Sequence, residues 1–364
     1  MHVKRVSLRA SVPWMVAAGL VVVPAMRAPA DPQKVPAGVP PAFARLLTGS
    51  LQFSASDVGS LARGGTVSRT LASDESREVA IAGAIWCNVP LEYFLGRARD
   101  IVTFKRSDEV QQIGVFGPEA SAAELAGLTL DAQDVEDLRK CVPGQCKVRL
   151  DLKAIERFHY QVGWSAPDAV AQANRLAREV LAGYVAAYER SGNAGLIEYD
   201  DRDTPVSVAT GAATLLDRSA WLAAAAPGLR EYLEAYPGAT SPDAASVLYW
   251  SKEAFGMKPV ISATHMVVWQ ASGGAADATI LSKQIFATHY LDASLGITLL
   301  AGDRRPDRTG VFVVYVNRSL VDLLQGGLLG PFRRSVARSK SKDGLADHLE
   351  AVRRRVEADF KAGT

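Results

Sequence analysis

The sequence has little of most features that point directly to a function. Only 3 of its 364 residues are cysteines, 7% are aromatic, and the formal net charge is +2. A charge so close to zero does not favour nucleic acid as the main partner. The chain also lacks the Gly-x-Ser-x-Gly, Walker-type and His-Glu-x-x-His motifs. Serine-hydrolase, phosphate-loop and zinc-protease functions therefore have no support, and we expect no cofactor and no metal site.

The first thirty residues have the pattern of a secretory signal. The basic residues Lys4, Arg5 and Arg9 precede an uncharged, mostly apolar segment over residues 12–26. That segment is short for a membrane span, which needs about 20 apolar residues. Ala28-Pro29-Ala30 fits the small-residue rule for cleavage. We predict a cut after Ala30, so that residues 1–30 are removed, and a periplasmic or secreted location; the alternative is an uncleaved anchor, which Arg27 favours.

Removal of the signal changes the charge balance. Four of the 41 Lys and Arg lie in residues 1–30, which contain no acid, so 37 remain against 39 Asp and Glu. After the signal no second apolar run is long enough to span a bilayer. The mature chain is therefore expected to be a soluble protein with a slight negative charge.

The cysteines fit an oxidising compartment. In Cys141-Val-Pro-Gly-Gln-Cys146 a Pro-Gly turn separates two thiols, and such a turn can bring their Cβ atoms within bonding range. This spacing predicts a Cys141–Cys146 disulfide. The alternative is half of a metal site, but no second ligand pair stands at zinc spacing. Cys87 lies in an apolar strand pattern and is expected to be a buried free thiol.

Helices are predicted mainly in the middle of the chain. Residues 31–50 are expected to be a flexible leader followed by a short helix, and residues 51–364 a single domain. Leu91–Arg99 and Asp131–Lys140 have short helical patterns. From Ser165 to Tyr236 the pattern is largely helical, so we predict an inserted helical block over about 165–240.

Strands are predicted in two parts of the chain, between Thr66 and Phe116 and again from Val247 to Asn317. The segments Thr66–Leu71, Glu78–Asn88, Val110–Phe116, Val247–Trp250, Val260–Trp269, Thr279–Leu291, Ile297–Leu300 and Val311–Asn317 are rich in branched and aromatic residues. Short loops between sequential strands predict an antiparallel meander. Both faces of these strands are largely apolar, which indicates that each face is covered. A last helix from about Asp343 is expected to pack on the sheet.

The order of elements resembles the START-like, helix-grip superfamily of ligand-binding proteins. The likeness is carried by Gly64–Asp100, with its strand, strand and helix, and by residues 310–360, with a last strand and closing helix. It implies an α+β fold with a curved antiparallel sheet gripping a long C-terminal helix. The helical block and the Cys141–Cys146 loop depart from that pattern.

The whole chain is also similar to a group of exported bacterial proteins of unknown function. The segments that carry this likeness are Trp250–Glu253, Lys258–Ser262, Ser282–Gln284 and Asn317–Ser319. This resemblance implies an extracytoplasmic habitat and no particular chemistry.

Polar residues on the apolar strands are the candidate site. Charged side chains there are costly to bury unless they are paired, and a histidine beside a carboxylate or lysine can act as acid or base. The ligand-pocket candidates are His265, Lys283, His289, Tyr290, Asp292 and Arg318. The alternative is that each is an ordinary hydrogen-bonded structural residue.

A basic segment precedes the last helix. Leu328 and Leu329 are followed by Phe332, Arg333, Arg334 and Arg338, with Lys340 and Lys342 beyond. This mixture suits an anionic membrane surface, and the alternative is a solvated basic linker.

Three functions follow as hypotheses. The first is an exported protein that binds a hydrophobic small molecule or lipid in a cavity between sheet and helices. The second is an enzyme that uses His265, His289 or Asp292 as acid–base groups in the same pocket. The third is a structural or interaction protein of the envelope with a filled core.

Overall fold

The computed structural model describes residues 35–254, 257–322 and 330–363, and in the last range it describes side chains from residue 342 onward. The predicted signal peptide and its cleavage point after Ala30 lie outside the described residues.

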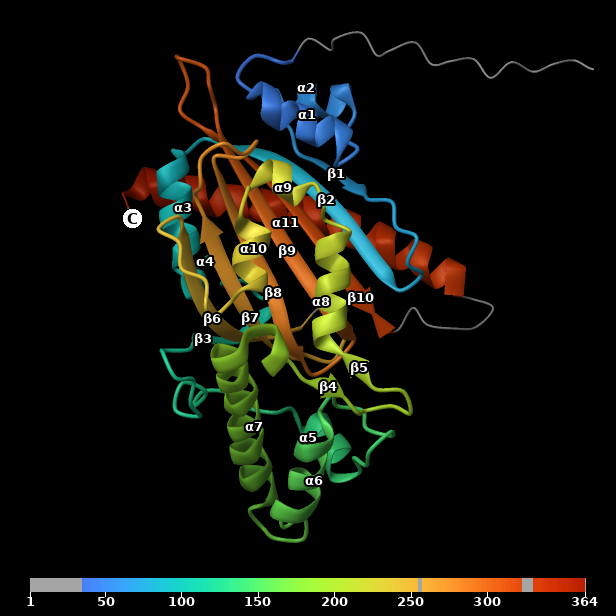
Figure 1. The fold of residues 1–364 in the computed structure, drawn as a ribbon. Coiled ribbons are helices and arrows are strands. Elements are labelled where there is room, and N and C mark those ends of the chain that lie inside the picture. Colours follow the sequence, from blue (N-terminus) through green and yellow to red (C-terminus); the bar gives the residue numbers. More distant parts are fainter. Residues whose placement is uncertain (1–34, 255–256, 323–329, 364) are drawn as a thin grey trace, which may run out of the picture. The chain divides into compact units, whose positions relative to one another are not determined.

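The described residues form an α+β fold around an eight-stranded antiparallel sheet (Figure 1). Along the sheet the strand order is β1-β2-β10-β9-β8-β7-β6-β3. The strands are β1 Val67–Thr70, β2 Glu78–Cys87, β3 Val110–Val115, β6 Ala244–Glu253, β7 Val260–Trp269, β8 Ala278–Ala287, β9 Leu291–Gly302 and β10 Val311–Val321. Strands β6 to β10 are sequential neighbours, which confirms the predicted meander.

One predicted strand is wrong. The apolar run Thr279–Leu291 was expected to be continuous, but β8 ends at Ala287 and β9 begins at Leu291. The backbone turns at Thr288–Tyr290, where Tyr290 has a φ of 63°. A left-handed residue of this kind breaks the extended chain, and tyrosine is not a residue type that signals it.

Short helices cover one face of the sheet. They are α1 Pro41–Gly49, α2 Ala55–Ala62, α8 Val208–Asp217, α9 Leu222–Ala225 and α10 Leu229–Glu234. Phe43 and Leu47 of α1 and Leu215 of α8 are fully buried in one cluster with Val314 and Ile297 of the sheet. The short helix predicted near residue 47 is therefore part of the core.

The opposite face, called here the α11 face, packs against α3 Leu91–Arg99, α4 Ile101–Phe104 and α11 Gly330–Ala362. Figure 1 shows α11 on the side of the sheet away from α8, α9 and α10. Leu345 and Leu349 of α11 approach Gly83 of β2, whose missing side chain leaves room for them. Helices on both faces explain why the strands are apolar on both sides.

The last helix begins earlier than predicted. The apolar stripe suggested a start near Asp343, but the helix runs from Gly330. Pro331 is compatible with the first helical turn, where no backbone N–H is needed. The basic residues that follow hid the helix because they break the apolar period, so the backbone from Gly330 is helical and not a linker.

The chain between β3 and β6 contains the helical block, which starts before residue 165. It includes α5 Ala132–Arg139, α6 Leu152–Gln161, α7 Ala169–Ser191, η1 Gly192–Gly195 and the two-stranded β4 Glu198–Tyr199 and β5 Val206–Ser207 as well as α8 to α10. On α7, Leu181, Val185 and Tyr188 pack against β7 and β8.

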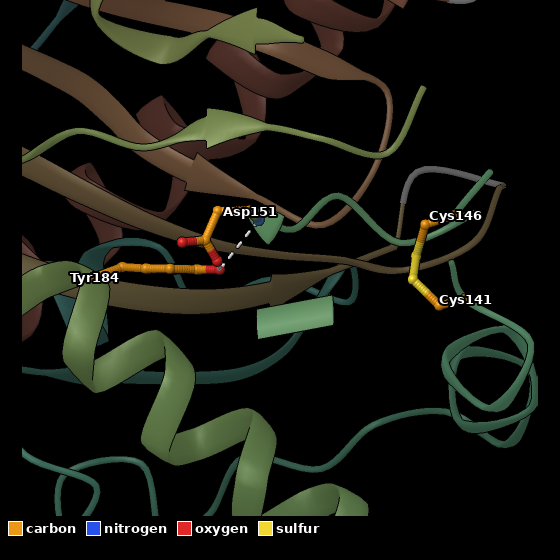
Figure 2. Close-up of a disulfide and its surroundings, with 4 residues drawn as sticks. All are labelled: Cys141, Cys146, Asp151 and Tyr184. Atoms are coloured by element: carbon orange, nitrogen blue, oxygen red, sulfur yellow. Dashed lines mark hydrogen bonds between the residues drawn. A yellow bond between two sulfur atoms is a disulfide. The ribbon is translucent and has the colours of Figure 1, made fainter. Parts of the chain in front are cut away.

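The predicted Cys141–Cys146 disulfide is confirmed and closes the loop after α5 (Figure 2). Gly144 takes a φ of 78° in this loop, a conformation that glycine adopts readily. The N–H groups of Gly144 and Cys146 donate to the carbonyls of Asp200 and Asp201, so the loop is fixed to the chain after β4. Nearby, the Tyr184 hydroxyl of α7 donates to the Asp151 carboxylate at the start of α6, over 2.5 Å (Figure 2).

Cys87 is buried and free, as expected, and burial raises the pKa of its thiol to about 12. A search of the described residues finds no helix with the length and apolar character of a membrane span.

Candidate functional site

Polar side chains share the α11 face with apolar ones. Side chains alternate along a strand, so Thr264 points to the same face as Met266, which packs in the cluster of Leu345 and Leu349. By the same rule Ser282 and Gln284 share the face of Ile280. The ladder places Thr264 opposite Gln284.

Together these residues form a band across five neighbouring strands, called here the polar stripe. Its members are Ser251 of β6, Ser262 and Thr264 of β7, Ser282 and Gln284 of β8, Ser294 and Thr298 of β9, and Tyr315, Asn317 and Ser319 of β10. Gly296 of β9 lies among them, and a Cβ there would stand 3.0 Å from the Tyr315 hydroxyl. The glycine therefore lets the phenol lie across the strand.

Part of the polar stripe is satisfied internally. The hydroxyls of Ser294 and Ser319 are 2.8 Å apart, and Ser319 donates to the side-chain oxygen of Asn317 over 2.8 Å. Ser251 contacts Ser262 at 3.2 Å and donates to Glu253 at 2.5 Å. These contacts lie at the β10 and β6 ends.

The centre of the polar stripe is different. Thr264, Ser282, Gln284 and Thr298 make no side-chain hydrogen bond to any other residue that the structure describes. Thr264 is nevertheless only 6% exposed and Gln284 only 8%. Their polar atoms are not completely shielded, because the fully buried side-chain atoms without a partner lie elsewhere, at Ser219 and Thr279 among others. The centre therefore offers free donors and acceptors in a largely buried place.

Charged groups border the stripe beside α4. Lys105 pairs with Glu253 at 2.8 Å, and its ammonium lies 5.7 Å from the centre of the Tyr249 ring. Burial disfavours the charge of Lys105, but Tyr249 and Glu253 outweigh it and raise the pKa of the amine above its usual value. Burial, assisted by Lys105, lowers the pKa of His348 on α11, so this imidazole is neutral near pH 7.

His265 and Lys283, two of the predicted site residues, lie together on the other face. They stand opposite each other in the ladder, and both are buried. Tyr188 of α7 joins them, because its hydroxyl is 2.8 Å from His265 Nδ1 and accepts from Lys283 Nζ at 3.2 Å. Beyond the histidine, Ser246 Oγ lies 2.6 Å from Nε2. A polar chain thus runs from Lys283 to the exposed Ser246.

The charge of Lys283 sets the direction of each hydrogen bond in this series. An ammonium has no acceptor, so Lys283 donates to Tyr188, whose proton then points to His265 Nδ1. Nε2 carries the remaining hydrogen and donates to Ser246. Burial, together with Lys283, lowers the pKa of His265 to about 3, and burial lowers the pKa of Lys283 to about 8. His265 is therefore a neutral donor to Ser246 near pH 7, not a base.

His289 and Tyr290 lie in the turn between β8 and β9 and not on a strand face. His289 Nε2 is 3.1 Å from Asp134 of α5, which also pairs with Lys258 at 3.2 Å. This contact joins the turn to the helical block.

Asp292 and Arg318 each belong to a separate buried ion cluster. Asp292 meets Arg77 at 2.8 Å, Arg149 at 2.6 Å and Arg202 at 3.0 Å. Arg318 pairs with the fully buried Glu78 at 2.5 Å, and Arg218 also reaches that carboxylate. The six predicted residues are thus divided among four places: His265 lies with Lys283, His289 with Tyr290, and Asp292 and Arg318 each lie apart.

The remaining candidates add little. A small cavity of about 30 Å³ lies between α6, α7 and the sheet, lined by Phe158, Val180 and Phe286 among others. Ligand pockets typically measure about 300–1,000 Å³, so this space suits water at most.

Phe332, Arg333, Arg334 and Arg338 lie in the first turns of α11, and their side chains are outside the description. Within the described residues no group of His, Cys, Asp or Glu could hold a metal ion.

The polar stripe was missed by sequence reasoning, although a signal exists. Ser262-x-Thr264 and Ser282-x-Gln284 place polar residues at every second position of otherwise apolar strands. The charged neighbours His265 and Lys283 lie between these positions and so point to the opposite face.

Comparison of the chain with protein-family models, with curated proteins and with solved structures finds no match.

Proposed function

We propose that the chain is an exported binding protein that holds a hydrophobic small molecule or lipid on the α11 face, between the sheet and helices α3, α4 and α11. The observation that carries the proposal is the set of free polar groups at the centre of the polar stripe. Thr264 and Gln284 have little exposed surface and no side-chain hydrogen bond to another described residue, and they share their face with the apolar Met266 and Ile280. Binding sites commonly combine an apolar wall with a few convergent polar groups.

A START-like, helix-grip architecture is part of this proposal. Its support is the order of elements: strand β2, short helices α3 and α4, strand β3, the antiparallel run β6 to β10, and the long α11. That order agrees with what the resemblance implies, apart from the helical block between β3 and β6.

Export is proposed from the first thirty residues and supported by the disulfide, since such bonds persist mainly outside the cytoplasm. We expect the mature protein to begin at Asp31. The intact mass of protein recovered from the host checks this, and a mass that includes residues 1–30 would show a retained anchor. The basic first turns of α11 remain a candidate contact for anionic membranes, which binding to anionic vesicles tests.

Native mass spectrometry of protein purified from its host tests the binding function. We expect a bound species that is lost after denaturation in organic solvent. Protein carrying the double substitution Thr264→Val and Gln284→Leu should arrive empty, whereas Thr279→Val, on the opposite face of β8, should still carry the species. Empty wild-type protein would oppose binding and favour the structural role with a filled core.

A second function, acid–base chemistry at Ser246, is favoured by its 2.6 Å contact with His265. His265 becomes an acceptor for the Ser246 proton only when Lys283 is neutral. Labelling of Ser246 by a fluorophosphonate, rising as pH passes 8, would support an enzyme, and no labelling of Ser246 at any pH would exclude this role.

A further inference from the structure

The free groups at the centre of the polar stripe are all uncharged. They are the hydroxyls of Thr264, Ser282 and Thr298 and the amide of Gln284. Each can both donate and accept a hydrogen bond. Such a set suits a hydroxyl, carbonyl or amide group on a ligand, because it can satisfy either role.

The charged groups that border the stripe already have partners. Lys105 and Glu253 neutralise each other at 2.8 Å, and Glu253 also accepts from Ser251. The Arg355 guanidinium of α11 donates to the backbone carbonyls of Phe104 and Arg106. His348 is uncharged near pH 7. None of these four groups, Lys105, Glu253, Arg355 and His348, is left to pair with a ligand carboxylate, phosphate or ammonium.

Burial of an unpaired ion is expensive, with an effective penalty of several kcal/mol. A neutral polar group needs only hydrogen bonds, which the stripe can supply. The flanking Met266, Ile280 and Val313 belong to the apolar cluster on the same face. An apolar tail can therefore lie beside the polar end, and methionine adapts to irregular shapes.

We propose that the ligand is an uncharged amphipathic molecule, with a hydroxyl, carbonyl or amide group held at Thr264 and Gln284 and an apolar part against Met266 and Ile280. This inference rests on the proposed binding function and narrows it to a class. Fatty acids, phospholipids and cationic amphiphiles are excluded as the preferred ligands.

Calorimetric titration of the mature protein with four probes of equal chain length tests the class. The probes are decanol, decanamide, decanoate and decyltrimethylammonium. We expect both neutral probes to bind at least tenfold more tightly than either ion. Thr264→Val and Gln284→Leu, made separately, should each weaken the neutral probes about tenfold, whereas Thr279→Val should leave them unchanged. Thermal unfolding of each variant establishes that it is folded.

The outcomes separate the two proposals. If decanoate or decyltrimethylammonium binds as tightly as decanol, the site exists but the neutral class is wrong; tighter binding of decanoate would implicate the basic residues early in α11. If the neutral probes bind but neither variant weakens them, the assignment to the polar stripe is wrong. If no probe binds, the binding function itself fails, and the class fails with it.

Discussion

Lys283 of β8 lies directly opposite His265 of β7, and both side chains are buried without a carboxylate partner among the described residues. Lys283 is held by the Tyr188 hydroxyl and by the side-chain oxygen of Asn193, which are neutral. A buried amine usually needs a counter-ion. This pair therefore makes the stability of the protein depend on pH in two separate ranges.

The substitution Lys283→Met should change how the stability of the protein depends on pH in the alkaline range. The pKa of Lys283 is lowered from 10.5 to about 8 in the folded protein. Below pH 8 Lys283 is charged in both the folded and the unfolded protein, so the full cost of burying its charge is present. Between 8 and 10.5 the unfolded chain binds more protons, so wild-type stability rises with pH, by up to about 3 kcal/mol. Urea unfolding of both proteins across this range measures it, and the Met variant should lack the rise. Parallel curves would contradict the prediction.

The substitution His265→Gln should change how the stability of the protein depends on pH in the acid range. The pKa of His265 is lowered from 6.5 to about 3, so the folded protein resists protonation that the unfolded chain accepts. Wild-type stability should therefore fall as pH drops from 6.5 towards 3, by up to about 4 kcal/mol. The variant should show a flatter pH profile in thermal unfolding. His159→Gln, on the exposed surface of α6, is the control, and an equal flattening there would show that the effect is not specific.

Glu78→Ala should destabilise the fold strongly. It removes a fully buried carboxylate that meets Arg318 at 2.5 Å and Arg218 at 2.9 Å. Removal of one partner from a buried pair leaves an uncompensated charge and costs about 3–5 kcal/mol. Glu179→Ala, which breaks the exposed pair with Arg157, should cost no more than about 1 kcal/mol. Equal losses in chemical denaturation would refute this reading of the Glu78 cluster.

Gly83→Ala should disturb the contact between β2 and α11. A Cβ at Gly83 would stand 2.7 Å from Leu349 and 3.0 Å from Leu345. Overpacking of this kind costs about 1–3 kcal/mol. A matched control is Gly96→Ala on α3, where a Cβ meets nothing within 4 Å; there the gain in helix propensity should stabilise by up to about 1 kcal/mol. Thermal unfolding should give opposite signs for the two variants.

Alkylation of the unfolded, unreduced protein should modify Cys87 alone. Cys141 and Cys146 are joined and become reactive only after reduction. The loop between them is short, so the bond is expected to contribute about 2 kcal/mol through loop closure. Mass spectrometry counts the labels. Three labels without reduction would show that the thiols are free in the isolated protein.

The positions of most elements could be predicted because local patterns carry them. Val260–Trp269 was predicted with the bounds that β7 has, and Leu91–Arg99 with those of α3. The Cys141–Cys146 bond followed from a turn between neighbouring thiols, which needs no knowledge of distant residues. The turn at Thr288–Tyr290 and the start of the last helix at Gly330 were not predicted, because their residue types give no local signal.

The candidate site was a different kind of problem. Alternation along β7 and β8 was enough to show that Thr264 and Gln284 point away from His265 and Lys283. Which face lies under α11, and whether a polar side chain there finds a partner, depends on residues far apart in the sequence. Leu345 and Leu349 close one face, while Tyr188 reaches His265 across 77 positions. Periodicity therefore determines the two faces of each strand, and only packing between distant elements decides what covers each face.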